Sequence, residues 1–80
     1  MIEIEKKYPI DVIITCIVSE VMPFGYFAKL EDEDVNNVII LIHLHNFENP
    51  NELVSIGDRI SGQVAGYHNK EIYIKFASKK

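Results

Sequence analysis

β-Branched and aromatic residues run through the whole sequence, and no apolar pattern of helical period extends beyond about ten residues. Strands are therefore the expected elements. Runs of apolar residues predict five of them, at 10–18, 26–31, 38–45, 59–67 and 71–77. Between the third and fourth strands, residues 49–51 could begin a single helical turn that ends before Gly57. The short polar turn at residues 68–70 joins the last two strands as a hairpin.

Five strands with one helical turn between the third and fourth are typical of a small all-β, Greek-key barrel, the OB-fold arrangement. The 80 residues leave room for one small domain with one modest core, which we expect to span about residues 10–77. The two ends, MIEIEKK and ASKK, are polar enough to fray.

The longest unbroken apolar run is VIILI at residues 38–42, far below the roughly 20 residues that a membrane helix needs. The start of the sequence lacks the apolar stretch of a signal peptide. Cys16 is the single cysteine, which excludes an internal disulfide and suits a reducing compartment. We therefore expect a soluble, cytoplasmic protein, with Cys16 as a small core residue rather than a nucleophile.

The formal net charge is −4, and residues 31–34 form one acidic run that is most simply a solvated loop after the second strand. This balance argues against tight, non-specific binding of phosphates. The C-terminal part is more basic, because the last dozen positions contain Lys70, Lys75, Lys79 and Lys80. A local positive surface could form there despite the negative total.

The stretch PFGYFAKL places three aromatic residues around a Pro and a Gly. In a strand that starts near Tyr26, side chains alternate between the two faces. Tyr26 and Ala28 then point one way, and Phe27 and Lys29 point the other. The alternation by itself leaves open which face is the core, and both Phe24 and Phe27 could simply be core residues.

Three segments resemble, in order and at matching spacing, the S1 domain, which is the RNA-binding repeat of ribosomal protein S1. VSEVMPFGYFAKL looks like the family's first hairpin, in which a strand leads into a Phe-Gly turn. LIHLHNF is similar to its third strand, and ENPNELVSIGDRISGQV resembles the Pro-containing helical turn that leads into the fourth. The resemblance covers about residues 10–77 and implies an OB-fold barrel that binds single-stranded RNA.

The resemblance also implies a set of RNA-contacting residues. Phe27 would be an exposed stacking surface beside Phe24, with Gly25 permitting a bulge that bends the strand around the barrel. His43 matches the histidine that these domains present beside the two aromatics. A base stacked on such a ring is worth roughly 1 to 3 kcal/mol and needs no particular sequence. With lysines for the phosphates, the implied RNA-binding residues are Phe24, Phe27, Lys29, His43, His68, Lys70 and Lys75.

The last hairpin departs from the family pattern, in which many members carry an Asp and then an Arg. Here the matching positions are His68 and, depending on how the shortened turn is aligned, Lys70 or Glu71. Only Lys70 could supply the missing positive charge.

His45 lies two residues after His43 and should share its face, so a His-x-His metal site is an alternative. A metal site usually needs three or four protein ligands, and no further Cys or His lies at a convincing spacing. We therefore expect no metal and no cofactor, and His45 would be a surface histidine without function.

The predicted outward face is also unusually apolar for this family. Ile17, Ile39 and Leu41 stand where polar residues are usual, and Gly is common at the positions of Cys16 and Ile40. Extra exposed apolar area of this kind often marks a protein contact. The alternative function is therefore a protein-interaction domain that kept the barrel but lost much of its nucleic-acid face, for example as a homodimer.

No enzyme signature is present: the sequence has no Gly-rich phosphate loop, no nucleophile elbow, and no catalytic pair that spacing suggests. We therefore expect a non-catalytic module that holds single-stranded RNA across the second, third and fifth strands, with single-stranded DNA left open as a ligand. Salt separates the two hypotheses. Binding through phosphates weakens steeply as salt rises, whereas apolar association does not.

Overall fold

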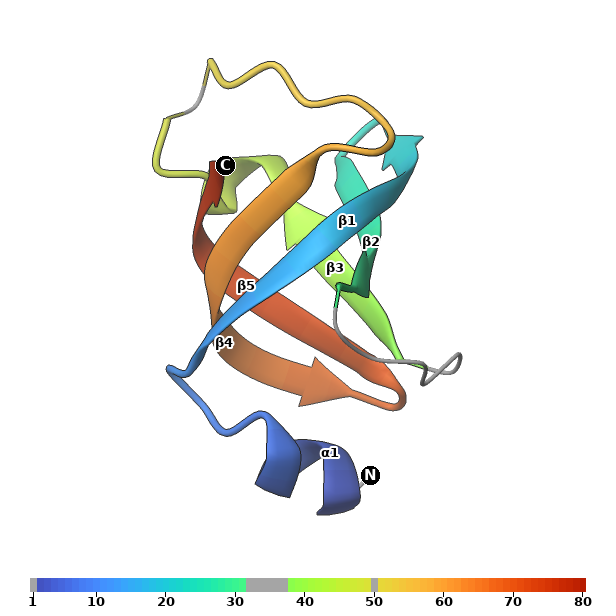
Figure 1. The fold of residues 1–80 in the computed structure, drawn as a ribbon, viewed down its shortest axis with the longest axis vertical. Coiled ribbons are helices and arrows are strands. Elements are labelled where there is room, and N and C mark those ends of the chain that lie inside the picture. Colours follow the sequence, from blue (N-terminus) through green and yellow to red (C-terminus); the bar gives the residue numbers. More distant parts are fainter. Residues whose placement is uncertain (1, 32–37, 50) are drawn as a thin grey trace.

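The structure is a computed structural model, and it describes residues 2–31, 38–49 and 51–80. These residues form five strands, one short α-helix and one turn of 3-10 helix, η1 (Figure 1). In chain order the elements are α1 (Ile2–Lys7), β1 (Ile13–Met22), β2 (Gly25–Leu30), β3 (Ile39–His43), η1 (Leu44–Asn46), β4 (Arg59–His68) and β5 (Glu71–Lys79).

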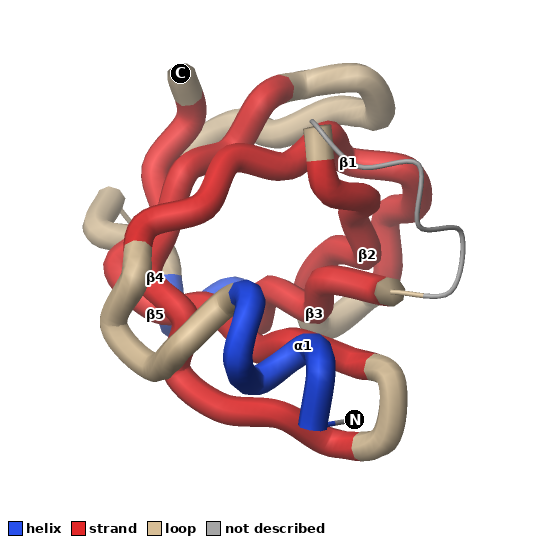
Figure 2. The backbone as a smooth tube through the Cα atoms, turned by 60° about the horizontal axis from the view of Figure 1, so that its bottom comes forward, coloured by secondary structure: helices blue, strands red, loops and turns tan. Residues whose placement is uncertain are grey.

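The five strands close into a barrel in the order β1-β2-β3-β5-β4, and β4 pairs back onto β1. Neighbouring strands are antiparallel except β3 and β5, which are parallel and therefore need a long connection. The segment from η1 through β4 provides it. The all-β fold class and the OB-fold arrangement predicted from the strand pattern are confirmed (Figure 1, Figure 2).

β-Branched side chains fill the barrel interior, because alternate residues of each strand point inward. Five isoleucines are completely buried there: Ile40, Ile42, Ile60, Ile72 and Ile74. Cys16 is also completely buried, and its Sγ lies 3.5 Å from the carbonyl oxygen of Ile60. Burial raises the pKa of this thiol to about 12. Cys16 is thus a core residue, as predicted.

Gly25 allows β2 to approach β3 closely and does not form the expected bulge. The bulge lies in the neighbouring strand β1, between Val18 and Glu20. Gly25 is buried, and a Cβ atom on it would lie 2.2 Å from the carbonyl oxygen of Ile42 in β3. A side chain at this position would therefore push the two strands apart.

Both polar ends contain secondary structure within the described residues. α1 covers most of the first segment, and β5 continues to Lys79. Ile4 and Tyr8 pack against the core, and the Tyr67 hydroxyl donates a hydrogen bond to the carbonyl oxygen of Tyr8. These tertiary contacts hold α1 against one end of the barrel (Figure 2).

The helical turn between β3 and β4 lies earlier than predicted. β3 ends at His43, where η1 follows at once, whereas residues 51–57 form a loop. The early turn brings Phe47 into the core, where its ring lies 5.6 Å from that of Tyr26, edge to face. Burying this aromatic ring explains the position of the turn, because aromatic pairs of this geometry stabilise cores.

The first strand also starts later than predicted, at Ile13, because the chain turns at Asp11, whose φ is 73°.

Of the acidic run after β2, Glu31 lies in a bend and residues 32–34 lie outside the described residues. No helix in the described ranges is long and apolar enough to cross a membrane.

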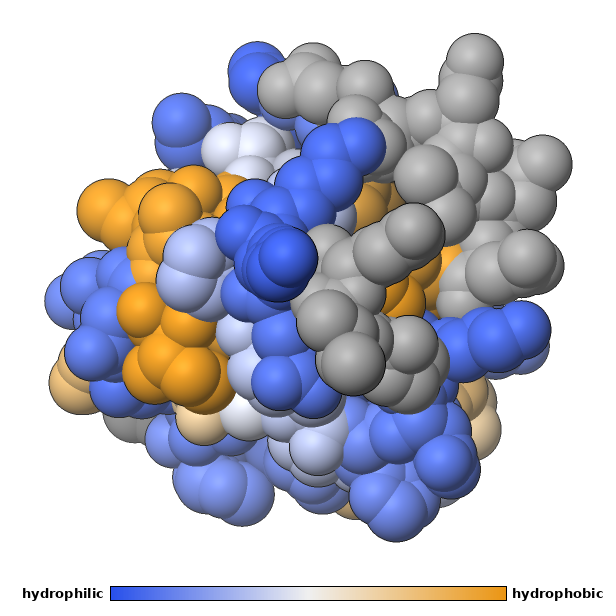
Figure 3. All heavy atoms as spheres, turned by 90° about the horizontal axis from the view of Figure 1, so that it is seen from below, coloured by the Kyte–Doolittle hydropathy of each residue, from blue (hydrophilic) through white to orange (hydrophobic). Residues whose placement is uncertain are grey.

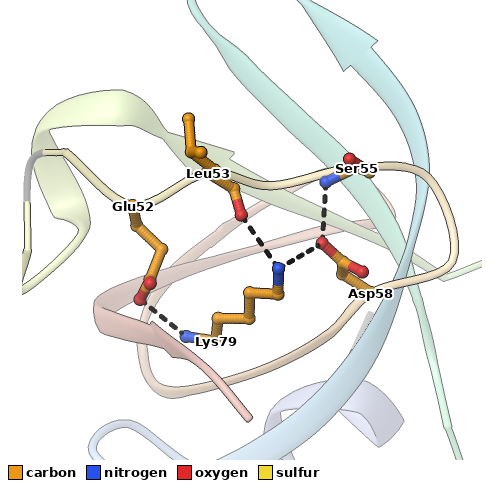
Figure 4. Close-up of polar contacts among 5 residues, drawn as sticks. All are labelled: Glu52, Leu53, Ser55, Asp58 and Lys79. Carbon is orange, nitrogen blue, oxygen red and sulfur yellow. Dashed lines mark hydrogen bonds and ion pairs between the residues drawn. The ribbon is translucent and has the colours of Figure 1, made fainter.

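Lys79 ties the loop between η1 and β4 to the end of β5 (Figure 4). Its Nζ donates to the carbonyl oxygen of Leu53 at 3.1 Å and lies 3.3 Å from Oδ2 of Asp58. Its backbone N–H donates to Oε1 of Glu52 at 3.1 Å. The same Asp58 oxygen accepts the backbone N–H of Ser55 at 2.8 Å. Lys79 and Asp58 together therefore contact the loop at Glu52, Leu53 and Ser55.

Candidate nucleic-acid interface

The second strand directs one aromatic ring into the barrel and the next one outward. Tyr26 is 8 % exposed and Ala28 is 1 % exposed, so both belong to the core. Phe27 and Lys29 therefore point outward, with Phe27 half-buried and Lys29 exposed. The two faces of β2 are thus those that the family resemblance implied.

Phe27, Leu41 and Tyr73 form one row across β2, β3 and β5. Phe27 pairs with Leu41, and Leu41 pairs with Tyr73. Directly paired residues on one face of a sheet have their Cβ atoms roughly 4.5 to 5.5 Å apart in antiparallel strands. Leu41 points away from the core between these two aromatic neighbours and is only 8 % exposed. The row is therefore a continuous apolar strip on the outside of the barrel.

Tyr73 is a member of this row that the sequence analysis missed. Tyr73 lies between Ile72 and Ile74, which are both completely buried. Because side chains of a strand alternate between the two faces, this pattern indicates that Tyr73 points outward. Its place beside Leu41 depends on the parallel pairing of β3 with β5, which the pattern does not reveal. The Tyr73 hydroxyl donates to Oε1 of Glu71 at 3.3 Å, and desolvation followed by the Glu71 charge raises the pKa of Tyr73.

Three more rings continue from this row at the end of β3. The ring centroids of Phe24 and His43 are 5.7 Å apart, and those of His43 and His45 are 5.2 Å apart. His43 pairs with Gly25, and Phe24 is 46 % exposed. We refer to Phe24, Phe27, Leu41, His43 and Tyr73 as the aromatic surface.

Two of the predicted lysines lie beside the aromatic surface. Lys29 follows Phe27 by two residues on the same face of β2, and Lys70 lies in the turn before β5. The carbonyl oxygen of Lys70 accepts the backbone N–H of Ile39 at 3.1 Å, which joins this turn to the start of β3. Both lysines are exposed, and within the described ranges neither forms an ion pair. His68, the last residue of β4, is exposed and pairs with Glu71.

The C-terminal lysines do not form the common positive surface that their clustering suggested. Lys75 forms an ion pair with Asp11 at 2.8 Å, and its Nζ lies 5.6 Å from the centre of the Phe76 ring. Lys79 is held by the loop contacts of Asp58. Folding brings acidic partners to both side chains, so Lys70 is the lysine of this group beside the aromatic surface.

Acidic side chains also lie at the aromatic surface. Glu20 of β1 pairs with Phe27 and is exposed, and Glu71 accepts the hydroxyl of Tyr73. The aromatic surface therefore borders two carboxylates, Glu20 and Glu71, as well as the two lysines. A ligand held mainly by phosphate contacts would gain little here, so stacking has to contribute most of the binding free energy.

The three apolar residues proposed as a protein-contact patch differ in exposure. Ile39 is 41 % exposed, Ile17 is half-buried opposite Lys29, and Leu41 is buried. The expectation of exposed apolar area at Leu41 is wrong, because its neighbours on the adjacent strands cover it. Ile39 is the exposed member of the three.

A separate apolar region lies where β1 begins, on the side of the barrel formed by β1, β4 and β5 (Figure 3). Ile10, Val12 and Ile13 are 49 %, 39 % and 66 % exposed. Ile13 and Phe76, which is 58 % exposed, line one shallow pocket of about 320 Å³. Phe76 thus provides an exposed ring of β5 outside the aromatic surface.

No protein family and no curated protein sequence matches the chain. Its fold is similar to that of uncharacterized protein MJ1198 from Methanocaldococcus jannaschii, with a TM-score of 0.67, 20 % identity, and 82 % of this chain and 88 % of that chain covered. It is also similar to the solution structure of GSP13 from Bacillus subtilis, with a TM-score of 0.66, 18 % identity and 86 % of this chain covered. The chain spans 55 % of the length of GSP13. At these identities the likeness establishes a shared barrel fold.

Proposed function

We propose that the protein is a non-catalytic, cytoplasmic binding module of the S1-domain type, which holds single-stranded RNA across β2, β3 and β5. The observation that carries the proposal is the row Phe27, Leu41 and Tyr73, which continues into the rings of Phe24 and His43. Successive bases of a single strand stack on such a series of rings. The sequence resemblance to the S1 domain supports the same face independently of the fold likeness.

Stacking rather than charge provides most of the affinity in this proposal. Each stacked base contributes roughly 1 to 3 kcal/mol, and every base offers a π-face, so the sequence preference is weak. Lys29 and Lys70 contact phosphates at the edges of the surface. Single-stranded DNA presents the same bases and phosphates, and contacts to the 2′-hydroxyl would distinguish the two.

An NMR titration of the labelled protein with a short single-stranded RNA tests the proposal. We expect the amide signals of β2, β3 and β5 around Phe27, Leu41 and Tyr73 to shift, while those around Ile13 and Phe76 stay in place. A matched pair of variants then measures the contribution of one ring. Phe27→Ala should weaken RNA binding at least about fivefold, the lower end of the stacking range.

Phe76→Ala is the control, since it removes an exposed ring of the same type from the other side of the barrel. RNA affinity should be unchanged in this variant. If neither variant alters binding, or if RNA shifts no amide of β2 and β3, the proposal is wrong. Self-association that Phe27→Ala abolishes, without any RNA binding, would favour the protein-interaction alternative.

A further inference from the structure

Two imidazole rings lie against each other where β3 runs into η1. His43 is the last residue of β3, and His45 is the middle residue of η1. Their centroids are 5.2 Å apart and their planes deviate by 20° from parallel, so the rings are stacked. His43 also lies 5.7 Å from Phe24, which joins the pair to the aromatic surface. The sequence pattern alone assigns His45 no function, and its contact with His43 changes that interpretation.

The pair is accessible and carries little local charge. His45 is exposed and His43 is half-buried, and within the described ranges neither ring forms an ion pair. On β2 the residue opposite His43 is Gly25, and the turn before it contributes Pro23 and Phe24, none of them charged.

On the other side, η1 contacts the end of β5. The titratable groups there are Glu48, exposed just after η1, Glu52, which accepts the backbone N–H of Lys79, and the two last lysines. Of these, Lys79 is paired with Asp58, and Lys80 is exposed after the end of β5. Lys75 of the same strand is paired with Asp11. Lys75 and Lys79 are therefore engaged elsewhere, and the imidazole pair is a further source of positive charge at this end of the aromatic surface when it is protonated.

Stacked imidazoles respond to anions in a predictable way. Histidine changes charge between roughly pH 5 and 8, and its protonated ring donates from both nitrogens. A phosphodiester placed against both rings attracts positive charge on each of them. An anionic ligand should therefore bind together with a proton.

We propose that His45 is a further ligand-contacting residue, and that the His43–His45 pair binds a phosphodiester of the single strand and takes up a proton on binding. The inference rests on the proposed function and adds its regulation by pH. Neutral rings still provide stacking surface, and protonated rings add phosphate contacts. Affinity therefore increases as pH falls through the titration range of histidine.

The test measures the affinity for a short single-stranded RNA from about pH 8 to about pH 5.5, the range in which histidine titrates, at constant ionic strength. Affinity should increase about five- to tenfold over this range, well within the limit of about tenfold per pH unit that uptake of one proton sets. His45→Gln should abolish most of this increase. NMR titration of the ring protons should also show His45 holding its proton to higher pH in the complex than in the free protein.

Glu48→Gln is the control, because it removes an exposed titratable group just after η1 and leaves both imidazole rings in place. It should keep the full pH dependence. If RNA binds with an affinity that pH does not change, or if His45→Gln keeps the wild-type increase, the inference is wrong while the proposed function stands. If RNA binds at no pH, both the proposed function and this inference are wrong.

Discussion

At the scale of single residues, the short distance between the backbones of β2 and β3 requires a glycine at one position. Gly25 lies in β2 directly opposite His43 of β3, next to the end of the aromatic surface. A Cβ atom at Gly25 would lie only 2.2 Å from the Ile42 carbonyl oxygen, which leaves no room for a methyl group. Gly25 therefore sets the distance between β2 and β3 next to Phe24 and His43.

Gly25→Ala should destabilise the protein by about 1 to 3 kcal/mol, the usual cost of overpacking, because the two paired strands must move apart. Urea unfolding followed by circular dichroism measures this change. Gly66→Ala is the control, since a Cβ atom there meets nothing within 4 Å. It should change the free energy of unfolding by less than about 0.5 kcal/mol. Equal stability of the two variants would contradict the close-approach argument.

At the scale of elements, the loop between η1 and β4 depends on polar contacts with β5. Leu53 and Ile56 in this loop are 83 % and 66 % exposed, so packing contributes little to holding those two residues. Val54, which lies between them, packs against the core, and Lys79 and Asp58 add the polar connection to β5. The pKa of Asp58 lies below its usual range, mainly because the carboxylate accepts the Ser55 N–H, with a further contribution from Lys79.

This shift predicts how the contribution of Asp58 depends on pH. Because its pKa is lower in the folded state, the ionised carboxylate stabilises the fold above the unfolded value near about 3.9, and this contribution is lost as pH falls below it. Asp58→Asn should therefore lower the melting temperature at about pH 7 and differ less from wild type below about pH 3. Glu48→Gln, which changes an exposed carboxylate after η1, should behave like wild type throughout. A constant difference between Asp58→Asn and wild type across this range would argue against the ionic contribution.

At the scale of the whole molecule, the net charge of −4 sets the electrostatic character of binding. The protein as a whole repels a polyanion, and in the described ranges only Lys29 and Lys70 lie beside the aromatic surface without an acidic partner. Binding that depends mainly on stacking should therefore be weak, with an affinity that falls only moderately as salt rises, in contrast to that of strongly basic RNA-binding proteins.

We predict that the logarithm of RNA affinity falls against the logarithm of salt concentration with a slope of about −1.4, which two phosphate contacts to a single strand would produce. Fluorescence anisotropy at several salt concentrations measures the slope. Lys70→Glu should weaken binding and make the slope shallower. A slope steeper than about −3 would mean that more cations contact the RNA than the structure provides. Unchanged binding in Lys70→Glu would exclude the last hairpin from the site.

The alternation of residue types by itself determined the barrel strands and most of their inward and outward faces. Side chains of a strand alternate with a period of two, so the burial of Tyr26 and Ala28 and the outward position of Phe27 are local properties. The buried position of Cys16 follows from the same rule. These features need no knowledge of which strand lies beside which.

Only the tertiary structure decided which outward residues become neighbours. Tyr73 joins Leu41 because β5 pairs in parallel with β3, and Lys75 forms an ion pair because folding brings Asp11 to it. α1 forms in the polar first segment, where Ile4 packs against the core. In each case the deciding contact joins residues that are far apart in the chain, or it depends on a surface that exists only after folding. The local periodicity of a sequence does not predict such contacts.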